Sequence, residues 1–291
     1  MSSPAKNGFA AFLRGLWNFL TTVVTGVLVT VESTVGWVLS AVSFIAMLIF
    51  VVPVIGTLLR WVWFIAQTAV WRLVGLVDFL VAFTGLWPAK ILRIRVIILA
   101  DDSAGATATR AALVPHIQSA IDIFHDEANV RLVPSLAFRY TTGFADKATA
   151  GEHWAKDAYR KSPTTDLLVE CSAGALGDDL VLTGSRFTLI GLIDDFYGNF
   201  RKFIGYGAPL CVMIVRDVGD HSTIGCSVGP LTNYVTVEGS NASCMAHEIG
   251  HACGLWHIDD SQNLMYPYDG PTGLANWQVA MLRNSRHVTY F

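Results

Sequence analysis

The sequence predicts an apolar, all-α region over residues 1–90, followed by an α+β domain over residues 91–291. Three observations support this division. Charged side chains are rare before residue 91, short apolar runs typical of strands follow it, and a helix with paired histidines comes after most of those runs. In the second part we therefore expect a twisted mixed sheet, the histidine-bearing helix and a further helix near the C-terminus.

The first region has the composition of a membrane protein. Six of the nine tryptophans lie there, and the whole chain has 15% charged residues, below the roughly 25% of soluble proteins. Residues 35–59 form a run of 25 residues without a charge, and about 20 apolar residues are enough to cross a bilayer. Residues 16–31 are a weaker span, and the apolar run after Arg14 lacks the small-residue cleavage site of a signal peptide. The charged residues of the region are Lys6, Arg14, Glu32, Arg60, Arg72, Asp78 and Lys90.

A third apolar segment, residues 60–87, carries a narrow polar stripe. Arg60, Gln67 and Asp78 fall within about 20° of one another around a helix. The stripe either lines the seam of a small helix bundle, which we favour, or faces water on a helix that lies in the membrane interface. The region therefore has two or three spans.

The number of spans decides on which side of the membrane the second part lies. If the basic residues Lys6 and Arg14 stay in the cytoplasm, three spans place the C-terminal domain outside and two spans leave it inside. Lys90, Arg93 and Arg95 directly after the apolar region favour the inside. The bundle interpretation therefore leaves the outside only slightly favoured.

The elements of the second part follow from hydrophobic periodicity. Residues 91–100 are an apolar run with alternating arginines, which predicts a strand. Residues 107–127 carry apolar side chains at three-to-four spacing, which predicts a helix despite Pro115. A closing helix over residues 276–286 is expected to direct Trp277, Ala280, Met281 and His287 at the core. Further strands are expected over residues 131–140, 166–171, 187–193 and 210–215, with two short runs between 223 and 237 separated by Gly229-Pro230.

Residues 247–257 place three imidazoles and one carboxylate around a single point. Residues four apart share a helix face, so His247 and His251 direct ring nitrogens at one metal ion. Gly254 can adopt the positive φ of a helix C-terminus, and the bend carries His257 back to the same ion. Three neutral imidazoles leave the fourth zinc position open to water, as in catalytic sites, and Glu248 can take a proton from that water. A lone H-E-x-x-H also occurs by accident on ordinary helices, but the two further residues at fixed offsets favour a zinc site.

These residues match the signature H-E-x-x-H-x-x-G-x-x-H at every fixed position, and the sequence here resembles the metzincin zinc endopeptidases. Asn263-Leu264-Met265-Tyr266-Pro267 is similar to the methionine turn of that superfamily, and its spacing and Tyr-Pro ending resemble the matrixin branch most. The resemblance implies a metzincin-like α+β zincin fold for roughly residues 92–291. It also implies that Met265 forms an apolar floor under the histidines and that Gly254 supports the site.

The resemblance implies where a substrate lies. In that fold the edge strand before the zinc helix pairs with the substrate backbone, and we assign residues 224–228 to it. Residues 267–273 are expected to shape the pocket just beyond the scissile bond. The predicted substrate-binding residues are Ile224, Tyr266, Pro267 and Tyr268.

Some features of matrixins are not found in the sequence. Matrixins commonly carry a pro-segment with a cysteine that blocks the zinc, but no cysteine precedes Cys171. The loop that holds their structural zinc and calcium is not recognisable after Cys171. The acidic pairs at 178–179 and 194–195 are better explained as solvated loop residues. We therefore predict one catalytic Zn²⁺; the sequence does not support structural Ca²⁺ or a second zinc ion.

Composition also limits the partners. Five of the 20 basic and two of the 23 acidic residues precede residue 91, so residues 91–291 carry a net charge of −6, which argues against nucleic-acid binding.

The five cysteines are odd in number, so at least one has no intrachain partner. Cys253 within the histidine motif is explained as a small buried apolar residue. Asn241-Ala242-Ser243 matches a glycosylation acceptor but is better explained as a helix cap.

The predicted function is that of a membrane-anchored zinc metalloendopeptidase that hydrolyses peptide bonds of protein substrates. His247, His251 and His257 hold the metal, and Glu248 is the general base and acid. The alternative is a catalytically silent membrane scaffold that binds peptides, although such a protein has no use for Glu248. An intramembrane protease needs its ligands within a span, and these histidines lie more than 150 residues beyond the last one. The expected partners are a protein or peptide substrate and the lipid bilayer; the sequence sets no oligomeric state.

Overall fold

The computed structural model of the protein describes residues 4–50, 55–82, 87–98, 100–101, 105–106, 108–134, 207, 209–215, 218, 223–231, 233–268 and 272–290. Its elements in chain order are α1 (Pro4–Phe50), α2 (Ile55–Val74), α3 (Leu76–Ala82), β1 (Lys90–Ile98), β2 (Ala100–Asp101), β3 (Gly105–Ala106), α4 (Arg110–Ala128), β4 (Val130–Pro134), β5 (Leu210–Val215), β6 (Gly225–Cys226), η1 (Gly229–Leu231), β7 (Tyr234–Glu238), η2 (Ala242–Cys244), α9 (Met245–Ala252), α10 (Asn276–Arg283) and β8 (Val288–Thr289).

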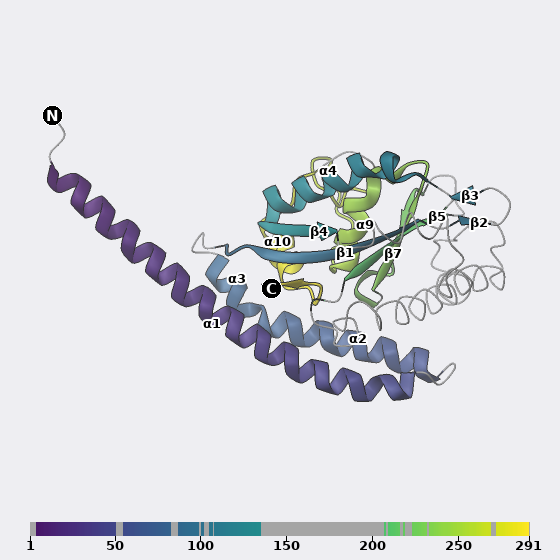
Figure 1. Ribbon diagram of the computed structural model, residues 1–291, viewed down its shortest axis with the longest axis horizontal. Helices are drawn as coiled ribbons and strands as arrows, with labels where there is room; N and C mark the ends of the chain where they lie inside the picture. The colour runs from purple at the N-terminus through teal and green to yellow at the C-terminus, as the bar shows by residue number, and fades with distance from the viewer. Residues whose placement is uncertain are drawn as a thin grey trace.

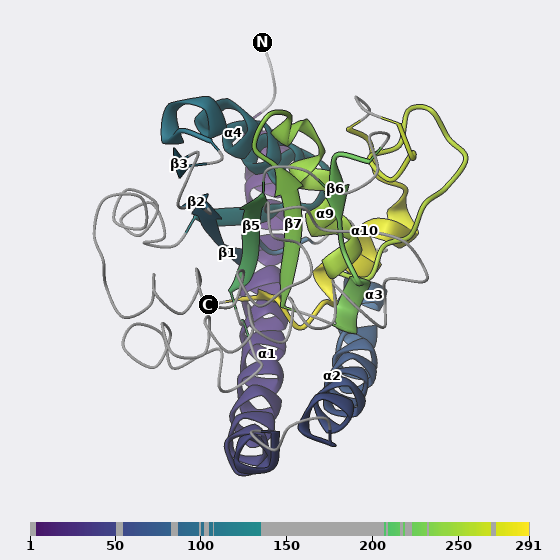
Figure 2. The same cartoon turned by 90° about the vertical axis from the view of Figure 1, so that its right-hand side faces the viewer.

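A mixed sheet forms the centre of the C-terminal part (Figure 2). Its strand order is β4-β1-β5-β7-β6, and β8 pairs with β1. The first four strands are parallel, whereas β6 runs antiparallel to β7 and lies at the end of the described sheet. Every residue of β5 is buried, as expected for a parallel strand that is covered on both faces. The predicted mixed sheet is confirmed.

Helix α4 is the predicted helix over residues 107–127. The Thr109 side chain caps it by accepting a hydrogen bond from the Ala112 N–H at 3.2 Å. Asn129 ends it in the left-handed conformation, with φ 48°. Pro115 lies inside the helix without ending it. Its buried face packs on the sheet through Leu113, Ile117, Ala120 and Phe124.

The remaining element predictions have mixed outcomes. The strands over 91–100 and 210–215 are confirmed as β1 and β5, and the two runs between 223 and 237 are β6 and β7. The strand over 131–140 is described only as far as Pro134, and those over 166–171 and 187–193 lie outside the described residues. The inward direction of Trp277 is wrong, because its side chain is 41% exposed. The buried face of α10 is set by Val279 and Leu282, and Trp277 lies roughly opposite them on the helix.

The N-terminal helices lie alongside the sheet domain. In Figure 1, α1 and α2 run side by side on the opposite side of the sheet from α4, and α1 continues beyond the domain toward the N-terminus. Of the uncharged run over residues 35–59, residues 35–50 belong to α1 and residues 55–59 to α2.

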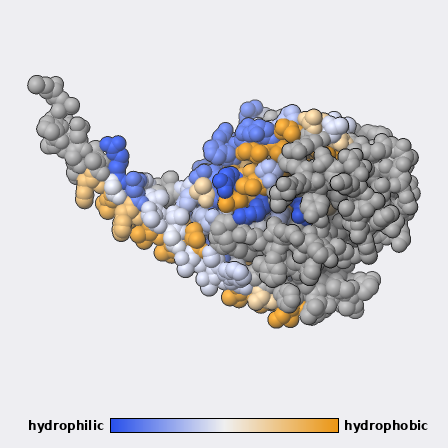
Figure 3. All heavy atoms as spheres, in the orientation of Figure 1, coloured by the Kyte–Doolittle hydropathy of each residue, from blue (hydrophilic) through white to orange (hydrophobic). Residues whose placement is uncertain are grey.

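One stretch of the described residues, Phe12–Leu39 in α1, is long and apolar enough to cross a membrane. Length and composition alone do not separate an anchor from a signal sequence or a core helix. Figure 3 shows hydrophobic side chains along the part of α1 that projects from the body of the molecule. Those exposed there include Phe12, Leu13, Leu16, Trp17, Phe19 and Leu20.

A buried ionic network joins the N-terminal helices to the sheet domain. Lys90 at the start of β1 pairs with Glu32 of α1 at 2.9 Å and with Asp78 of α3 at 3.3 Å. Asp78 also pairs with Arg283 of α10 at 3.3 Å and accepts a hydrogen bond from the Tyr290 hydroxyl at 2.6 Å. Two acidic and two basic side chains therefore neutralise one another out of contact with water, the arrangement in which buried charges are tolerated.

The polar stripe predicted for residues 60–87 faces inward, but not toward a bundle of membrane helices. Gln67 and Asp78 are 1% and 2% exposed, and both contact the C-terminal domain. The Gln67 side-chain oxygen accepts a hydrogen bond from Arg286 at 3.4 Å. The side chain of Arg60 lies outside the described residues. The sheet domain thus replaces the partner helices as the surface on which the stripe is buried.

Candidate metal centre

The helix that carries the first two histidines begins at a capped turn. Asn241 caps the short helix η2, which leads into the zinc helix, by accepting a hydrogen bond from the Ser243 N–H at 3.4 Å, whereas the zinc helix itself has no side-chain cap. Helix α9 follows directly and packs against α4 and β7. Its buried side chains include Met245 and Ile249. This packing fixes which way His247 and His251, on the remaining face, are directed.

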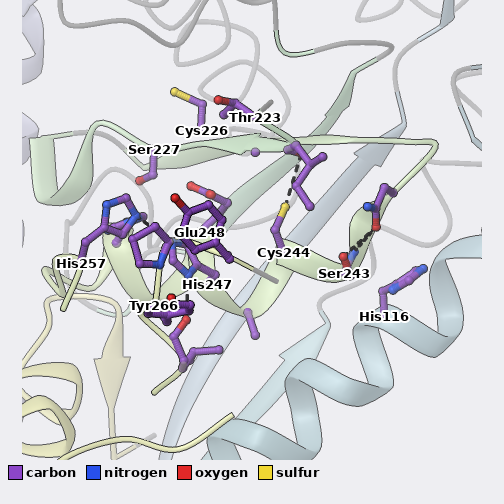
Figure 4. A pocket seen from close by; sticks show the side chains of 18 of the residues that line it. His116, Thr223, Cys226, Ser227, Ser243, Cys244, His247, Glu248, His257 and Tyr266 are labelled. Carbon is purple, nitrogen blue, oxygen red and sulfur yellow. Dashed lines mark hydrogen bonds between the residues drawn. The ribbon is translucent and has the colours of Figure 1, made fainter. Parts of the chain in front are cut away.

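The three histidines converge as predicted (Figure 4). The Nε2 atom of His257 lies 3.1 Å from the Nε2 atoms of both His247 and His251. Imidazoles on a tetrahedral zinc ion at ordinary Zn–N distances place their nitrogens about 3.4 Å apart. The spacing therefore fits a single zinc ion held by the three rings.

The protonation of the rings also fits a metal. His247 Nδ1 lies 2.7 Å from the Leu264 carbonyl oxygen, and His251 Nδ1 lies 2.8 Å from that of Leu255. Each Nδ1 therefore carries the proton and donates it, which leaves Nε2 as an unprotonated ligand. Burial lowers the pKa of His251 to about 4, so its ring is neutral at pH 7. The Nε2 atoms of His247 and His251 are therefore lone-pair donors that face the His257 ring, which fits a cation held between the three rings.

Gly254 makes the bend that brings His257 to the site. Its φ is +91°, a conformation that side chains disfavour, as the sequence predicts. The Gly254 N–H donates to the His251 carbonyl at 2.8 Å, and the Leu255 N–H donates to that of Gly250 at 3.0 Å. These bonds close the end of α9 and start the return of the chain toward His257.

Glu248 lies beside the histidines and is only 6% exposed. Its Oε2 atom is buried and has no hydrogen-bond partner among the described residues. Burial raises the pKa of the carboxyl to about 8, and a cation held by the three rings would oppose that shift. An unpartnered carboxyl oxygen next to a metal site is available to exchange a proton with water or substrate.

The edge strand β6 approaches Glu248 so closely that residue 225 has to be glycine. A Cβ atom built on Gly225 would lie 2.7 Å from Glu248 Cγ and 2.7 Å from Cys244 Sγ. The Cys244 thiol donates to the Ile224 carbonyl at 3.4 Å and ties the strand to the start of α9. This role of Gly225 was not predicted from the sequence, although a glycine inside a predicted strand is a known sign of close approach.

Met265 is fully buried beneath α9. A Cβ atom on Gly250 would lie 2.7 Å from Met265 Sδ, so the sulfur packs directly against the helix between the two histidines. The methionine turn is held from α10. Asn263 and Gln278 exchange two side-chain hydrogen bonds of 2.6 and 3.0 Å, and the Ala275 N–H donates to Gln278 at 2.8 Å.

The role of Gln278 was not predicted from the sequence either. Its signal is its position three residues after Ala275, where a glutamine reaches back to the amide at the start of its helix. The half-buried Arg72 of α2 contacts the end of α9, a partner that the sequence did not predict. A charge within an apolar segment is itself a sign of a functional or structural partner.

A cavity of about 930 Å³ lies over the histidines. Its wall includes residues of α4, β6, the start of α9 and the segment after Met265. Figure 4 shows Thr223, Cys226 and Ser227 along one side and Tyr266 beside the histidines. All four predicted substrate-binding residues line it: Ile224, Tyr266, Pro267 and Tyr268.

The remaining site predictions concern other metals and the cysteines. The three histidines are the one group within the described ranges whose ligand atoms gather for a metal ion. The acidic pairs at 178–179 and 194–195 lie outside those ranges. Cys211, Cys244 and Cys253 are buried thiols, whereas Cys226 is disulfide-bonded. Cys253 is thus the buried apolar residue that the sequence suggested.

Comparison with known families agrees with this geometry. The family model described as Matrixin matches residues 149–279. This range includes all three histidines, Glu248 and Met265, and it ends within α10. None of the curated proteins matches the chain.

Proposed function

Since the chain carries a matrixin domain and so belongs to the metzincin zinc metalloendopeptidases, we propose that it is a membrane-anchored protease that cuts protein substrates near the bilayer. The observation that carries the proposal is the convergence of the three histidine ligand atoms beside a buried carboxyl oxygen, Glu248 Oε2, which has no hydrogen-bond partner among the described residues. His247, His251 and His257 would hold the zinc ion. When bound, zinc supplies Lewis-acid polarisation of water and of the peptide carbonyl.

Glu248 is the proton carrier of the proposed reaction. Its Oε2 accepts a proton from the attacking water and later passes that proton to the leaving amine, so the peptide C–N bond breaks with no net change in the protein. Gly225 leaves the space in which this carboxylate lies. Met265 and Gln278 act further out, because they hold the helix and the turn on which the ligands lie.

The substrate would bind as an added strand. β6 is at the end of the described sheet and borders the cavity over the histidines. An extended peptide beside β6 gains main-chain hydrogen bonds, while pockets for alternate side chains provide selectivity. We assign Ile224 to that strand contact and Tyr266, Pro267 and Tyr268 to the opposite wall.

The membrane anchor would be α1. Phe12–Leu39 is the candidate span, and the Glu32 charge within it is neutralised by Lys90. With Lys6 and Arg14 in the cytoplasm, one crossing places the residues after α1 outside. The disulfide at Cys226 is also typical of oxidising compartments. We therefore place residues 91–291 outside and keep residues 1–90 as the anchoring region.

The enzymatic proposal is tested with Glu248→Ala. The variant is expected to keep bound zinc, because the three ligands are untouched, and to lose at least about 100-fold in kcat/KM on a peptide library. The silent scaffold predicts equal peptide binding by both proteins and cleavage by neither. A wild-type protein that holds zinc but cleaves no peptide would sink the enzymatic proposal.

The placement is tested on sealed vesicles of known orientation. Added protease is expected to degrade the C-terminal domain only from the side that corresponds to the outside, and alkaline carbonate is expected to leave the chain in the membrane. Release by carbonate would show that α1 is not an anchor. Protection of the domain from the outer side would place it in the cytoplasm.

A further inference from the structure

Helix α9 ends against the N-terminal helices as well as against its own domain. Its last turn satisfies the carbonyls of Ile249, Gly250 and His251 with amides that follow in the chain. The Cys253 carbonyl follows this last turn. It accepts a hydrogen bond of 3.1 Å from Nη2 of Arg72, which lies in α2. Arg72 is 181 residues away in the sequence.

The same guanidinium closes a second helix. Nη1 of Arg72 donates to the carbonyl of Met281 in the last turn of α10. Arg72 thus lies between the C-termini of α9 and α10, where unpaired carbonyls and the helix dipoles both favour a cation. A guanidinium suits this position, because its planar fork can donate to two carbonyls at once.

The contact is made at the turn that positions the third ligand. A side chain at Gly254 would collide with the Arg72 guanidinium, so α2 packs directly on this turn. Gly254 starts the return of the chain to His257. His257 contributes the nitrogen that lies 3.1 Å from each of the other two ligands. A shift of the turn therefore moves one ligand relative to the two on α9.

We propose that Arg72 is a positioning residue for the zinc site, so that the N-terminal helices complete the catalytic unit in addition to holding it at the membrane. Only the measurement of peptide cleavage rests on the proposed function; zinc affinity and amide exchange do not depend on it. The ionic network of Lys90, Asp78 and Arg283 keeps α3, which follows α2 directly in the chain, against the domain. Arg72 extends this contact between the N-terminal helices and the domain to the end of the zinc helix, where it binds the Cys253 carbonyl.

The test uses the full chain in detergent micelles with three variants. Arg72→Met keeps the length of the side chain and removes both donors. Arg72→Lys keeps the charge but offers a single compact donor group. Leu73→Ala is the matched control, because Leu73 is the next residue on the same helix and is 68% exposed.

Three quantities are measured: zinc affinity by competition with a chelator, amide exchange at Gly254 and Leu255, and kcat and KM on a cleaved peptide. Arg72→Met is expected to weaken zinc binding about 10-fold or more, as for lost outer contacts at other metal sites. It should speed exchange at the two amides while that of α4 stays unchanged, and lower kcat with little change in KM. Arg72→Lys should recover part of each loss, and Leu73→Ala should match the wild type.

Wild-type zinc affinity and amide exchange in Arg72→Met would overturn the proposal, and so would equal losses in Leu73→Ala. If Arg72→Met does not fold, Arg72→Lys decides: normal zinc affinity and exchange in that variant overturn the proposal. If the wild type binds zinc but cleaves no peptide, the proposed function fails, while zinc affinity and exchange still test Arg72.

Discussion

Gly225 shows how closely the edge strand and the catalytic helix depend on a single residue. The strand can lie against Glu248 only because no Cβ atom intervenes. If the strand lay farther from α9, the Glu248 carboxylate would lose its contact with β6. The strand edge that we propose for substrate binding would also be displaced.

Gly225→Ala is expected to lower kcat/KM about 100-fold, the cost of displacing a catalytic group by about an ångström. Zinc content should not change, because none of the three ligands touches residue 225. The measurement is peptide cleavage together with metal analysis. Gly15→Ala is the control, since nothing lies within 4 Å of a Cβ atom there. Wild-type cleavage by Gly225→Ala would contradict this account of the strand.

At the scale of elements, the site is assembled from two helices, α9 and α10, with the methionine turn between them in the chain. α9 carries two ligands, and α10 holds the methionine turn through Gln278. The methionine turn also supplies the Leu264 carbonyl, which fixes the orientation of the His247 ring. A buried glutamine in α10 therefore acts on the metal site through two successive links, from Gln278 to Asn263 and from Leu264 to His247.

Gln278→Leu is expected to lower the free energy of unfolding by about 2–4 kcal/mol, because it leaves the Asn263 amide and the Ala275 N–H buried without their partner. Chemical unfolding of the zinc-loaded protein measures the change. In Gln118→Leu, which removes an exposed bond to Asp122, the loss should stay below about 0.5 kcal/mol. Equal losses in the two variants would show that the buried bonds add nothing.

At the scale of the whole molecule, the interface between the N-terminal helices and the sheet domain is ionic at its centre. Burial by itself would raise the pKa of Asp78, but Lys90 and Arg283 outweigh it, together with the Tyr290 hydroxyl, and hold the pKa below the ordinary value of 3.8. The unfolded chain therefore binds this proton at a higher pH than the folded chain does. The stabilisation from Asp78 is complete above the ordinary value and is lost as the pH falls through the lower folded pKa.

Asp78→Asn should be less stable than the wild type at pH 7 by about 3 kcal/mol, since it leaves two buried cations without their shared partner. The difference is expected to shrink as the pH falls below about 4, where the wild-type carboxyl also becomes neutral. Unfolding free energies at pH 7, 5, 4 and 3 provide the measurement. Asp126→Asn, at an exposed pair with His125, should differ little from the wild type throughout. A difference that stays constant with pH would contradict the shifted pKa.

The sequence by itself determined the metal ligands, Glu248, the bend at Gly254 and the buried methionine. All of them lie within twenty residues, and helix periodicity and local backbone preference act over that distance. It also determined most of the described strands and helix α4, because burial on one face leaves a regular pattern. The roles of Gly225, Gln278 and Arg72 were left to the tertiary structure.

Their roles depend on which surfaces meet, and a contact between residues 181 positions apart leaves no periodic pattern in either segment. The same reason explains the polar stripe of residues 60–87. Its sequence showed that Gln67 and Asp78 share one face, but a buried stripe is equally compatible with a helix bundle and with a folded domain. Only the packing of α2 and α3 on the sheet domain decided between these partners, because it supplied Arg286, Lys90 and Arg283 as the groups that satisfy the stripe.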